Sequence, residues 1–288
     1  ALLNGLEVVG KKIGDVNVVI LGAGASAISC AKHYVRLGVK PDNLIMLDSK
    51  GILTSKRMAD GELNEYKSEF ARDIDEGGIG DALEGADVFL GLSKGGLVSP
   101  EMVVSMAENP LIFALANPDP EITPEQVASV RDDAIVATGR SDYPNQINNV
   151  LGFPYIFRGA LDVRASEITE GMKMAATKAL AKLAKEPVPD DVSSAYGGEQ
   201  MSFGPDYLIP KPFDARVLIW EASAVAEAAV NEGVARISKQ DFDLDNYMEK
   251  LEARLGLTRS IMRRVINQAK RDQKRIVFCE GEDPTIVK

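Results

Sequence analysis

The sequence has 288 residues, of which 45% are hydrophobic and 26% charged, a composition typical of a globular protein with one or two domains. Lys and Arg number 33 against 43 Asp and Glu, and this net charge of −10 disfavours a nucleic-acid partner. No apolar run in the sequence reaches the roughly 18–20 residues of a membrane helix. The two cysteines, Cys30 and Cys279, match no metal-ligand spacing, so we expect reduced thiols in a cytoplasmic protein.

Five short apolar runs alternate with helical stretches before residue 140. Each run is rich in Val, Ile, Leu or Ala at successive positions, as in parallel strands buried on both faces; the runs are 16–21, 44–47, 88–92, 111–115 and 134–138. Between them, Ser99 and Thr123 are candidate helix N-caps, each followed by Pro and Glu. The alternation predicts an α/β fold with a doubly wound, Rossmann-like parallel sheet.

The pattern changes after residue 138 and predicts extra C-terminal helices. A loop-like stretch leads to a long helix in 168–184, whose apolar face comprises Met172, Ala175, Ala176, Ala179, Leu180 and Leu183. A second buried helix follows in 215–233, with Gly233 as its terminating residue. From residue 241 the chain turns to charged amphipathic helices and a final strand signal, 274–283. We therefore expect one domain over 1–240 and a helical connector with the start of another domain over 241–288.

A glycine-rich turn follows the first predicted strand. Its residues include Gly22, Gly24, Ala25, Ser26 and Ala27. The first glycine permits a sharp turn, the second allows the backbone to approach a pyrophosphate, and the small Ala27 lets helix and strand pack closely. The N-terminus of the following helix supplies free N–H groups for the phosphates. Because a strand precedes the turn and a helix follows it, the motif predicts a dinucleotide-binding site.

The second predicted strand ends at Asp48, a position from which a carboxylate accepts hydrogen bonds from a ribose in NAD-binding proteins. However, Ser49 and Lys50 follow directly, and Arg57 and Lys67 are near in sequence. A hydroxyl and several cations are suited to a 2′-phosphate, so the stretch favours NADP, with NAD as the alternative.

Several asparagines follow the later strands, where doubly wound sheets bind ligands. Asn117 follows the fourth run, and Asn148 and Asn149 lie beyond the fifth. An amide side chain offers a donor and an acceptor, which suits a carboxamide or a carboxylate with a hydroxyl. We interpret these three residues as ligand-binding and Asn145 as a turn former.

Four longer segments carry a family resemblance: DSKGILTSKR, FALANP, TGRSDYPNQINNVLGFPYIFRGALDVRA and SFGPDYLIPKPFD. They resemble segments of the bacterial NADP-dependent malic enzymes, in particular the hybrid type in which a phosphotransacetylase-like domain follows the malic enzyme. The strand signal at 274–283 resembles the opening of that second domain. The resemblance covers essentially the whole chain.

The resemblance implies oxidative decarboxylation of (S)-malate to pyruvate and CO₂ with formation of NADPH, assisted by Mg²⁺ or Mn²⁺. It implies that Gly24 to Ala27 hold the cofactor phosphates, and that Asn117 and Asn149 lie at the nicotinamide and malate with Asn148 beside them. The family's catalytic Tyr and Lys and its metal ligands belong to an N-terminal malic domain that would precede Ala1. The chain alone is then expected to be inactive, and the enzyme to be a homo-oligomer.

Two other functions fit parts of the pattern. Another NAD(P)-dependent dehydrogenase, such as an amino-acid dehydrogenase, would need a catalytic Lys and Asp set that we do not find in the sequence. A non-catalytic module that senses a dinucleotide would need only the glycine turn and its surroundings.

Overall fold

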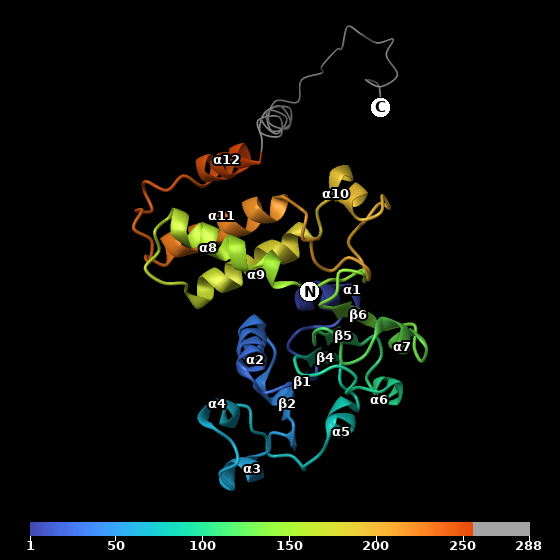
Figure 1. Cartoon of the computed structure of the whole chain (residues 1–288). Coiled ribbons are helices and arrows are strands. Elements are labelled where there is room, and N and C mark those ends of the chain that lie inside the picture. The colour runs from blue at the N-terminus through green and yellow to red at the C-terminus, as the bar shows by residue number, and fades with distance from the viewer. Residues whose placement is uncertain (256–288) are drawn as a thin grey trace. The chain divides into compact units, whose positions relative to one another are not determined.

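The computed structural model describes residues 1–255 (Figure 1). A first compact unit spans Ala1–Arg236, and a second begins at Ile237. The first unit is built on a six-stranded sheet with the order β3-β2-β1-β4-β5-β6. The strands are β1 (Val18–Leu21), β2 (Leu44–Asp48), β3 (Gly51–Ile52), β4 (Val88–Gly91), β5 (Leu111–Ala114) and β6 (Ile135–Thr138). The order and the flanking helices confirm the Rossmann-like α/β fold.

The five predicted strands are present, each within two residues of its predicted bounds, and they pair in parallel. The sheet is nevertheless mixed, because β3 runs antiparallel to β2 in a tight hairpin that pairs Asp48 with Gly51. This strand was not predicted. With only two residues it is too short to show any hydrophobic period.

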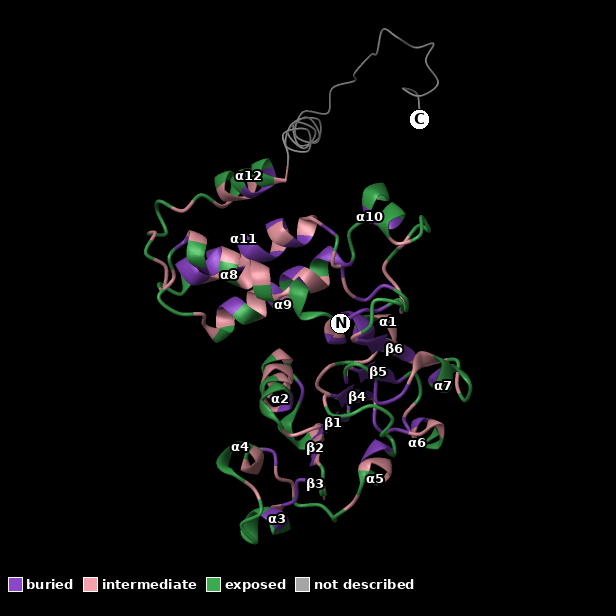
Figure 2. Ribbon diagram, in the orientation of Figure 1, coloured by how far each residue is buried: buried purple, intermediate pink, exposed green. Residues whose placement is uncertain are grey.

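Alternate residues of each strand enter two separate hydrophobic cores. Val18 and Ile20 pack on one face with α1 (Leu2–Val8) and α2 (Ala25–Leu37). Val19 and Leu21 pack on the other face. The helices there are α5 (Ile79–Leu83), α6 (Pro100–Val104) and α7 (Pro124–Ala128). Figure 2 shows the strands as a buried layer between these helices, as expected for a parallel sheet covered on both faces.

The predicted helix starts are confirmed at two positions. The Ser99 hydroxyl accepts a hydrogen bond from Met102 N at the start of α6, and Thr123 Oγ1 accepts one from Gln126 N at the start of α7. In α7 the Gln126 side chain also accepts from Thr123 N, which completes a capping box. The short helices α3 (Ser55–Ala59) and α4 (Glu65–Ser68) begin in the same way, at Thr54 and Asn64.

A group of helices follows β6: α8 (Phe153–Asp162), α9 (Glu170–Leu183), α10 (Asp190–Ala195) and α11 (Arg216–Asn231). The predicted apolar face of α9 is confirmed in part. Its members Met172, Ala176, Ala179 and Leu183 are buried, whereas Ala175 and Leu180 are half-buried. Gly233 has a φ of 74° just past α11, as predicted for a helix-terminating glycine.

In the second unit, the predicted amphipathic helix is present as α12 (Leu244–Arg254). The predicted second helix and the strand signal at 274–283 lie outside the described residues. Within residues 1–255, none of the helices is both long enough and apolar enough to cross a membrane.

Gly159 determines how closely α8 approaches α11. A Cβ atom at this position would lie 2.5 Å from the Ala222 carbonyl oxygen and 2.8 Å from Val225 Cβ. We expect Gly159→Ala to lower the free energy of unfolding by about 1–3 kcal/mol, because overpacking against a backbone outweighs the better helix propensity of Ala. Urea unfolding would measure this. Gly80→Ala in α5 is the control: its Cβ would meet only the Met102 side chain at 3.8 Å, so it should be neutral or stabilising.

Candidate cofactor-binding site

Neighbouring parallel strands end together at one edge of the sheet. Leu21, the last residue of β1, pairs with Gly91 of β4, which pairs in turn with Ala114 of β5 and then with Thr138 of β6. The loops after these strands therefore begin side by side. They include the glycine turn and Asn117, and the loop after β6 leads on to Asn148 and Asn149. This is the edge at which sheets of this type bind ligands.

The glycine turn has the geometry that its sequence predicts. Gly22 has a φ of 124°, and a Cβ atom there would lie 2.7 Å from the Leu92 carbonyl oxygen, so only glycine fits. Gly24 is exposed and is the N-cap of α2, and a Cβ atom at Gly24 would have no neighbour within 4 Å. The space beside Gly24 is thus open, as the approach of a pyrophosphate to the backbone requires.

The N-terminus of α2 has no internal counter-charge. Its N-cap has no side chain, and the first turn contains no acidic residue. Ala25 and Ser26 are exposed, whereas Ala27 is 1% exposed and packs in the core beside the sheet. The first N–H groups of a helix of 13 residues are therefore available to an anion.

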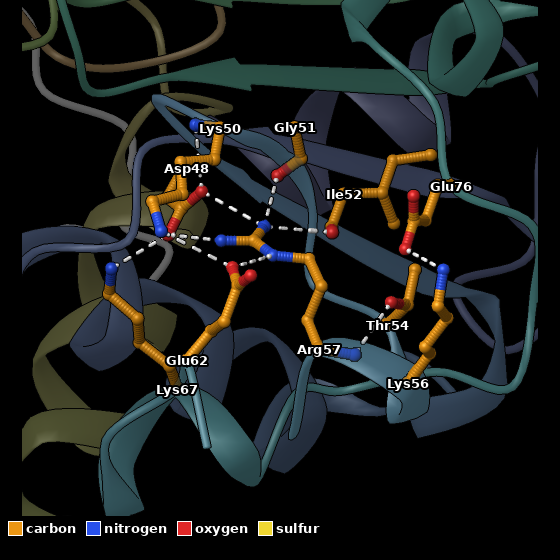
Figure 3. A network of polar contacts seen from close by, with 10 residues as sticks. All are labelled: Asp48, Lys50, Gly51, Ile52, Thr54, Lys56, Arg57, Glu62, Lys67 and Glu76. Carbon is orange, nitrogen blue, oxygen red and sulfur yellow. Dashed lines mark hydrogen bonds and ion pairs between the residues drawn. The ribbon is translucent and has the colours of Figure 1, made fainter. Parts of the chain in front are cut away.

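Asp48, at the carboxyl end of β2, lies at the centre of an ion-pair network (Figure 3). Its Oδ1 accepts hydrogen bonds from Arg57 Nη1 and Lys50 N, both at 3.0 Å. Its Oδ2 accepts from Lys67 Nζ at 2.8 Å and from Arg57 Nη2 at 3.2 Å. Both carboxylate oxygens are thus already paired.

Arg57 is held on every side. Besides Asp48, its guanidinium donates to the carbonyl oxygens of Gly51 and Ile52 and to Glu62 Oε2. Its side chain is only 7% exposed. Arg57 thus fixes the β2–β3 hairpin and the carboxylate of Asp48, and its contribution to binding the ribose end of the cofactor stays a prediction.

The network fixes the charge of Asp48. Burial raises the pKa of this carboxyl, but the hydrogen bonds from Arg57 and Lys67 outweigh burial and lower the pKa to about 2. Two lysines of this network remain accessible to solvent: the Lys50 side chain is 66% exposed and that of Lys67 25% exposed. Ser49 is also exposed. Lys56 lies apart from these groups, because it pairs with Glu76 on the other side of Arg57 from Asp48 (Figure 3).

The predicted substrate-binding asparagines are accessible. Asn117 is exposed directly after β5, and Lys94 is exposed in the loop after β4. Asn148 and Asn149 are also exposed, at the start of the 3-10 turn η2 (Asn149–Leu151). The Oδ1 atom of Asn148 accepts a hydrogen bond from Val150 N, so this side chain also caps the turn.

Asn145 and Lys211 form a clamp that the sequence did not reveal. Asn145, 2% exposed, donates to the carbonyl oxygens of Val136 and Pro205 and accepts from Leu208 N. Lys211, 7% exposed, donates to the Pro144 carbonyl oxygen and lies over the Tyr196 ring. Burial lowers the pKa of Lys211. The expected turn former is thus a buried cross-link that ties the loop after β6 to segment 205–211.

These two segments also line an open cavity of about 590 Å³, but none of the predicted site residues lines it. His33, the only histidine of the sequence, is half-buried in α2, with Nε2 2.8 Å from Thr177 Oγ1 of α9. Among residues 1–255 no group of three His, Cys, Asp or Glu side chains is arranged to hold a metal ion. The residues present therefore do not fit the metal that the resemblance implies.

The family model described as "Malic enzyme, NAD binding domain" matches residues 1–194. The chain belongs to the malic enzyme family. It is 54% identical to the "NADP-dependent malic enzyme" of Rhizobium meliloti (strain 1021), over 98% of this chain and 36% of that protein. It is 48% identical to a protein of the same organism named "NAD-dependent malic enzyme", over 100% of this chain and 37% of that protein.

A solved structure supports the same fold. The crystal structure of Entamoeba histolytica malic enzyme is similar to this chain with a TM-score of 0.76 and 36% sequence identity, over 96% of this chain and 54% of that one. The chain thus spans about a third of the length of the two Rhizobium relatives and about half of the solved neighbour.

For this malic enzyme domain, the Asp48 network makes a prediction about stability. Asp48→Asn removes the charge that holds Arg57 and should lower the free energy of unfolding at pH 7 by about 1–3 kcal/mol. The folded-state pKa of about 2 lies below the usual aspartate value of 3.8, so the stabilisation is present above pH 3.8 and is lost as the pH falls toward 2. The difference between wild type and variant should therefore shrink over that range.

Urea unfolding at pH 7, 4 and 3 measures this difference. Asp132→Asn is the control, because Asp132 is exposed and has no ion pair within the described part of the chain. A constant difference between wild type and Asp48→Asn across this pH range would contradict the assigned pKa.

Proposed function

We propose that this chain binds NADP as the cofactor-binding part of a malic enzyme that oxidatively decarboxylates (S)-malate to pyruvate and CO₂ with formation of NADPH. The observation that carries the proposal is the network at the end of β2. There a carboxylate that would otherwise repel a 2′-phosphate has both oxygens paired with cations and a backbone N–H.

The network favours NADP over NAD for two reasons. In NAD-binding sites an acidic residue at this position accepts hydrogen bonds from the ribose hydroxyls, but here Arg57 and Lys67 already engage Asp48. In addition, the three cations Lys50, Arg57 and Lys67 outnumber the two carboxylates of Asp48 and Glu62. The excess positive charge, together with the exposed Ser49, suits a group that carries nearly two negative charges.

The names of the relatives do not settle the cofactor, because one Rhizobium meliloti relative is named NADP-dependent and the other NAD-dependent. The remaining groups of a dinucleotide fit the same edge of the sheet. The open space at Gly24 and the N-terminus of α2 suit the pyrophosphate. Asn117, exposed in the loop after β5, suits the carboxamide of the nicotinamide.

For malate we assign Asn149, with Asn117 and Asn148 beside it, because exposed amides can both donate to a carboxylate and accept from a hydroxyl. The bound nicotinamide would supply the hydride acceptor. The chain's own residues orient the two reactants: the lysines hold the adenosine end, α2 holds the pyrophosphate, and the asparagines hold malate against the ring.

The groups for the proton steps and for Mg²⁺ or Mn²⁺ are proposed to come from residues outside this sequence, in an N-terminal malic domain. We further propose a phosphotransacetylase-like domain after this chain, a homo-oligomeric assembly and a cytoplasmic location. The lengths of the Rhizobium relatives, of which this chain spans 36% and 37%, support a larger multidomain enzyme. This chain alone is then expected to bind cofactor without turning malate over.

Calorimetric titration with NADP⁺ and with NAD⁺ tests the cofactor. We expect NADP⁺ to bind at least tenfold more tightly, about 1.4 kcal/mol, because charge-assisted hydrogen bonds hold its 2′-phosphate. Equal affinities would overturn the assignment to NADP.

The same titration of Lys67→Ala locates the effect. Removing Lys67 exposes the 2′-phosphate to the charge of Asp48, so NADP⁺ should bind at least tenfold more weakly, about 1.4 kcal/mol. NAD⁺ should bind equally well or more tightly, because Asp48 Oδ2 then accepts only from Arg57 Nη2 and can also accept from a ribose hydroxyl. Lys56→Ala is the matched control, since Lys56 pairs with Glu76 on the far side of Arg57. A Lys56→Ala variant that loses NADP⁺ affinity as strongly would show only a general charge effect.

Asn149→Ala tests the substrate assignment in the enzyme of which we propose this chain to be part. We expect kcat/KM for malate to fall by about 100-fold, or about 2.7 kcal/mol, with unchanged NADP⁺ affinity. NADPH formation from malate is the measurement. Asn231→Ala, at the exposed end of α11, serves as control. Unchanged malate kinetics in Asn149→Ala would exclude Asn149 from the site.

A further inference from the structure

A buried carboxylate joins two loops at the edge of the sheet where the nicotinamide is proposed to bind. Glu121 lies between β5 and α7 and is 0% exposed. Its Oε1 accepts a hydrogen bond from Ser93 N, in the loop after β4, at 3.0 Å. Its Oε2 accepts from Ala116 N, in the loop after β5, also at 3.0 Å. Each oxygen therefore holds a different loop.

Strand β4 leaves room for the Glu121 carboxylate at its last residue, Gly91. A Cβ atom on Gly91, the last residue of β4, would lie 2.3 Å from the Glu121 carboxyl carbon and 2.5 and 2.6 Å from its oxygens. No larger residue could stand there without displacing Glu121. The Glu121 carboxylate can therefore be buried against β4 only because Gly91 has no side chain.

Backbone contacts also join the loop after β4 to the loop after β5. We call these contacts, together with those of the Glu121 carboxylate, the junction. Gly96 N donates to the Pro120 carbonyl oxygen and Val98 N to that of Glu121, both at 3.1 Å. A Cβ atom on Gly95 would lie 2.7 Å from the Asp119 carbonyl oxygen. The two loops are therefore in direct backbone contact, and they carry the exposed Lys94 and Asn117.

The same junction reaches the glycine turn. Leu92 N donates to the Leu21 carbonyl oxygen at 2.8 Å, and the Leu92 carbonyl oxygen is the atom that a Cβ on Gly22 would meet. The ion-pair network of Asp48, in contrast, makes no contact with Glu121 through any of its hydrogen bonds in the described structure. The junction therefore belongs to the nicotinamide half of the proposed site and the Asp48 network to the adenosine half.

We infer that Glu121 is a positioning residue that fixes the Lys94 and Asn117 loops relative to each other, and so sets the affinity of the nicotinamide half of the cofactor without affecting the adenosine half. This inference rests on the proposed binding of NADP. A glutamine at this position could accept from only one of the two N–H groups, and its amide N–H₂ would face the other as donor against donor.

The test compares NADP⁺ with 2′,5′-ADP, which contains the 2′-phosphate but lacks the nicotinamide. In calorimetric titrations of Glu121→Gln, we expect NADP⁺ affinity to fall at least tenfold and 2′,5′-ADP affinity to stay within twofold of wild type. Retained 2′,5′-ADP binding also shows that the variant is folded. Equal losses for both ligands, or no loss for either, would overturn the inference.

Gly95→Ala provides a second variant, because it forces the loops apart at an exposed position without altering the buried carboxylate. It should give the same selective loss of NADP⁺ affinity. Gly14→Ala is the matched control: it lies before β1, at the opposite end of the strands, where a Cβ would come no closer than 3.7 Å, to the Gly38 carbonyl oxygen, and it should change neither affinity. A Gly95→Ala variant that binds both ligands like wild type would overturn the inference.

If the proposed NADP site itself is wrong, wild type will fail to bind 2′,5′-ADP or will not prefer NADP⁺ to NAD⁺. That result differs from a wild type that binds both NADP⁺ and 2′,5′-ADP while its Glu121→Gln variant keeps full NADP⁺ affinity. The two failures are therefore distinguishable in the same set of titrations.

Discussion

The parallel pairing of β1, β4, β5 and β6 is the constraint on which the candidate site depends. Because parallel neighbours need crossover connections, the helices cover the faces of the sheet and leave its carboxyl edge to loops. The ends of these four strands are paired residue by residue, from Leu21 through Gly91 and Ala114 to Thr138. Residues as far apart in sequence as Leu21 and Thr138 thus come to one edge of the sheet.

Once the loops start side by side, close packing between them decides which residues are tolerated. Gly22, Gly91 and Gly95 each face an atom that a Cβ would approach to less than 3 Å. At Gly22 and Gly95 that atom is a backbone oxygen of the neighbouring loop, and at Gly91 it belongs to the buried Glu121 carboxylate. Glycine at this edge therefore serves loop-to-loop contact as much as approach to a phosphate. At Gly24, in contrast, a Cβ atom would face open space.

The features predicted correctly from sequence are those with local causes. Runs of β-branched and aliphatic residues identify buried strands, the Ser-Pro-Glu and Thr-Pro-Glu patterns identify helix starts, and the glycine turn follows from its strand and helix neighbours. The roles of Glu121, Asn145 and Lys211 could not be predicted in this way. Each depends on a partner about 5 to 70 positions away that only the fold brings near. A single acidic or amide residue in a loop carries no signal of such a contact.

Asp48 could be predicted only in part. Its position at the end of the second strand was predictable, but its state was not, because that state depends on the geometry of the β2–β3 hairpin and of Arg57. An acidic residue at this position usually indicates NAD. Here Asp48 instead forms ion pairs with Arg57 and Lys67 and holds these two cations in place. The same reasoning reconciles a net charge of −10 with a phosphorylated ligand. At physiological salt, charges farther than about 8 Å are largely screened, so the few groups around Asp48 decide the sign of the local field.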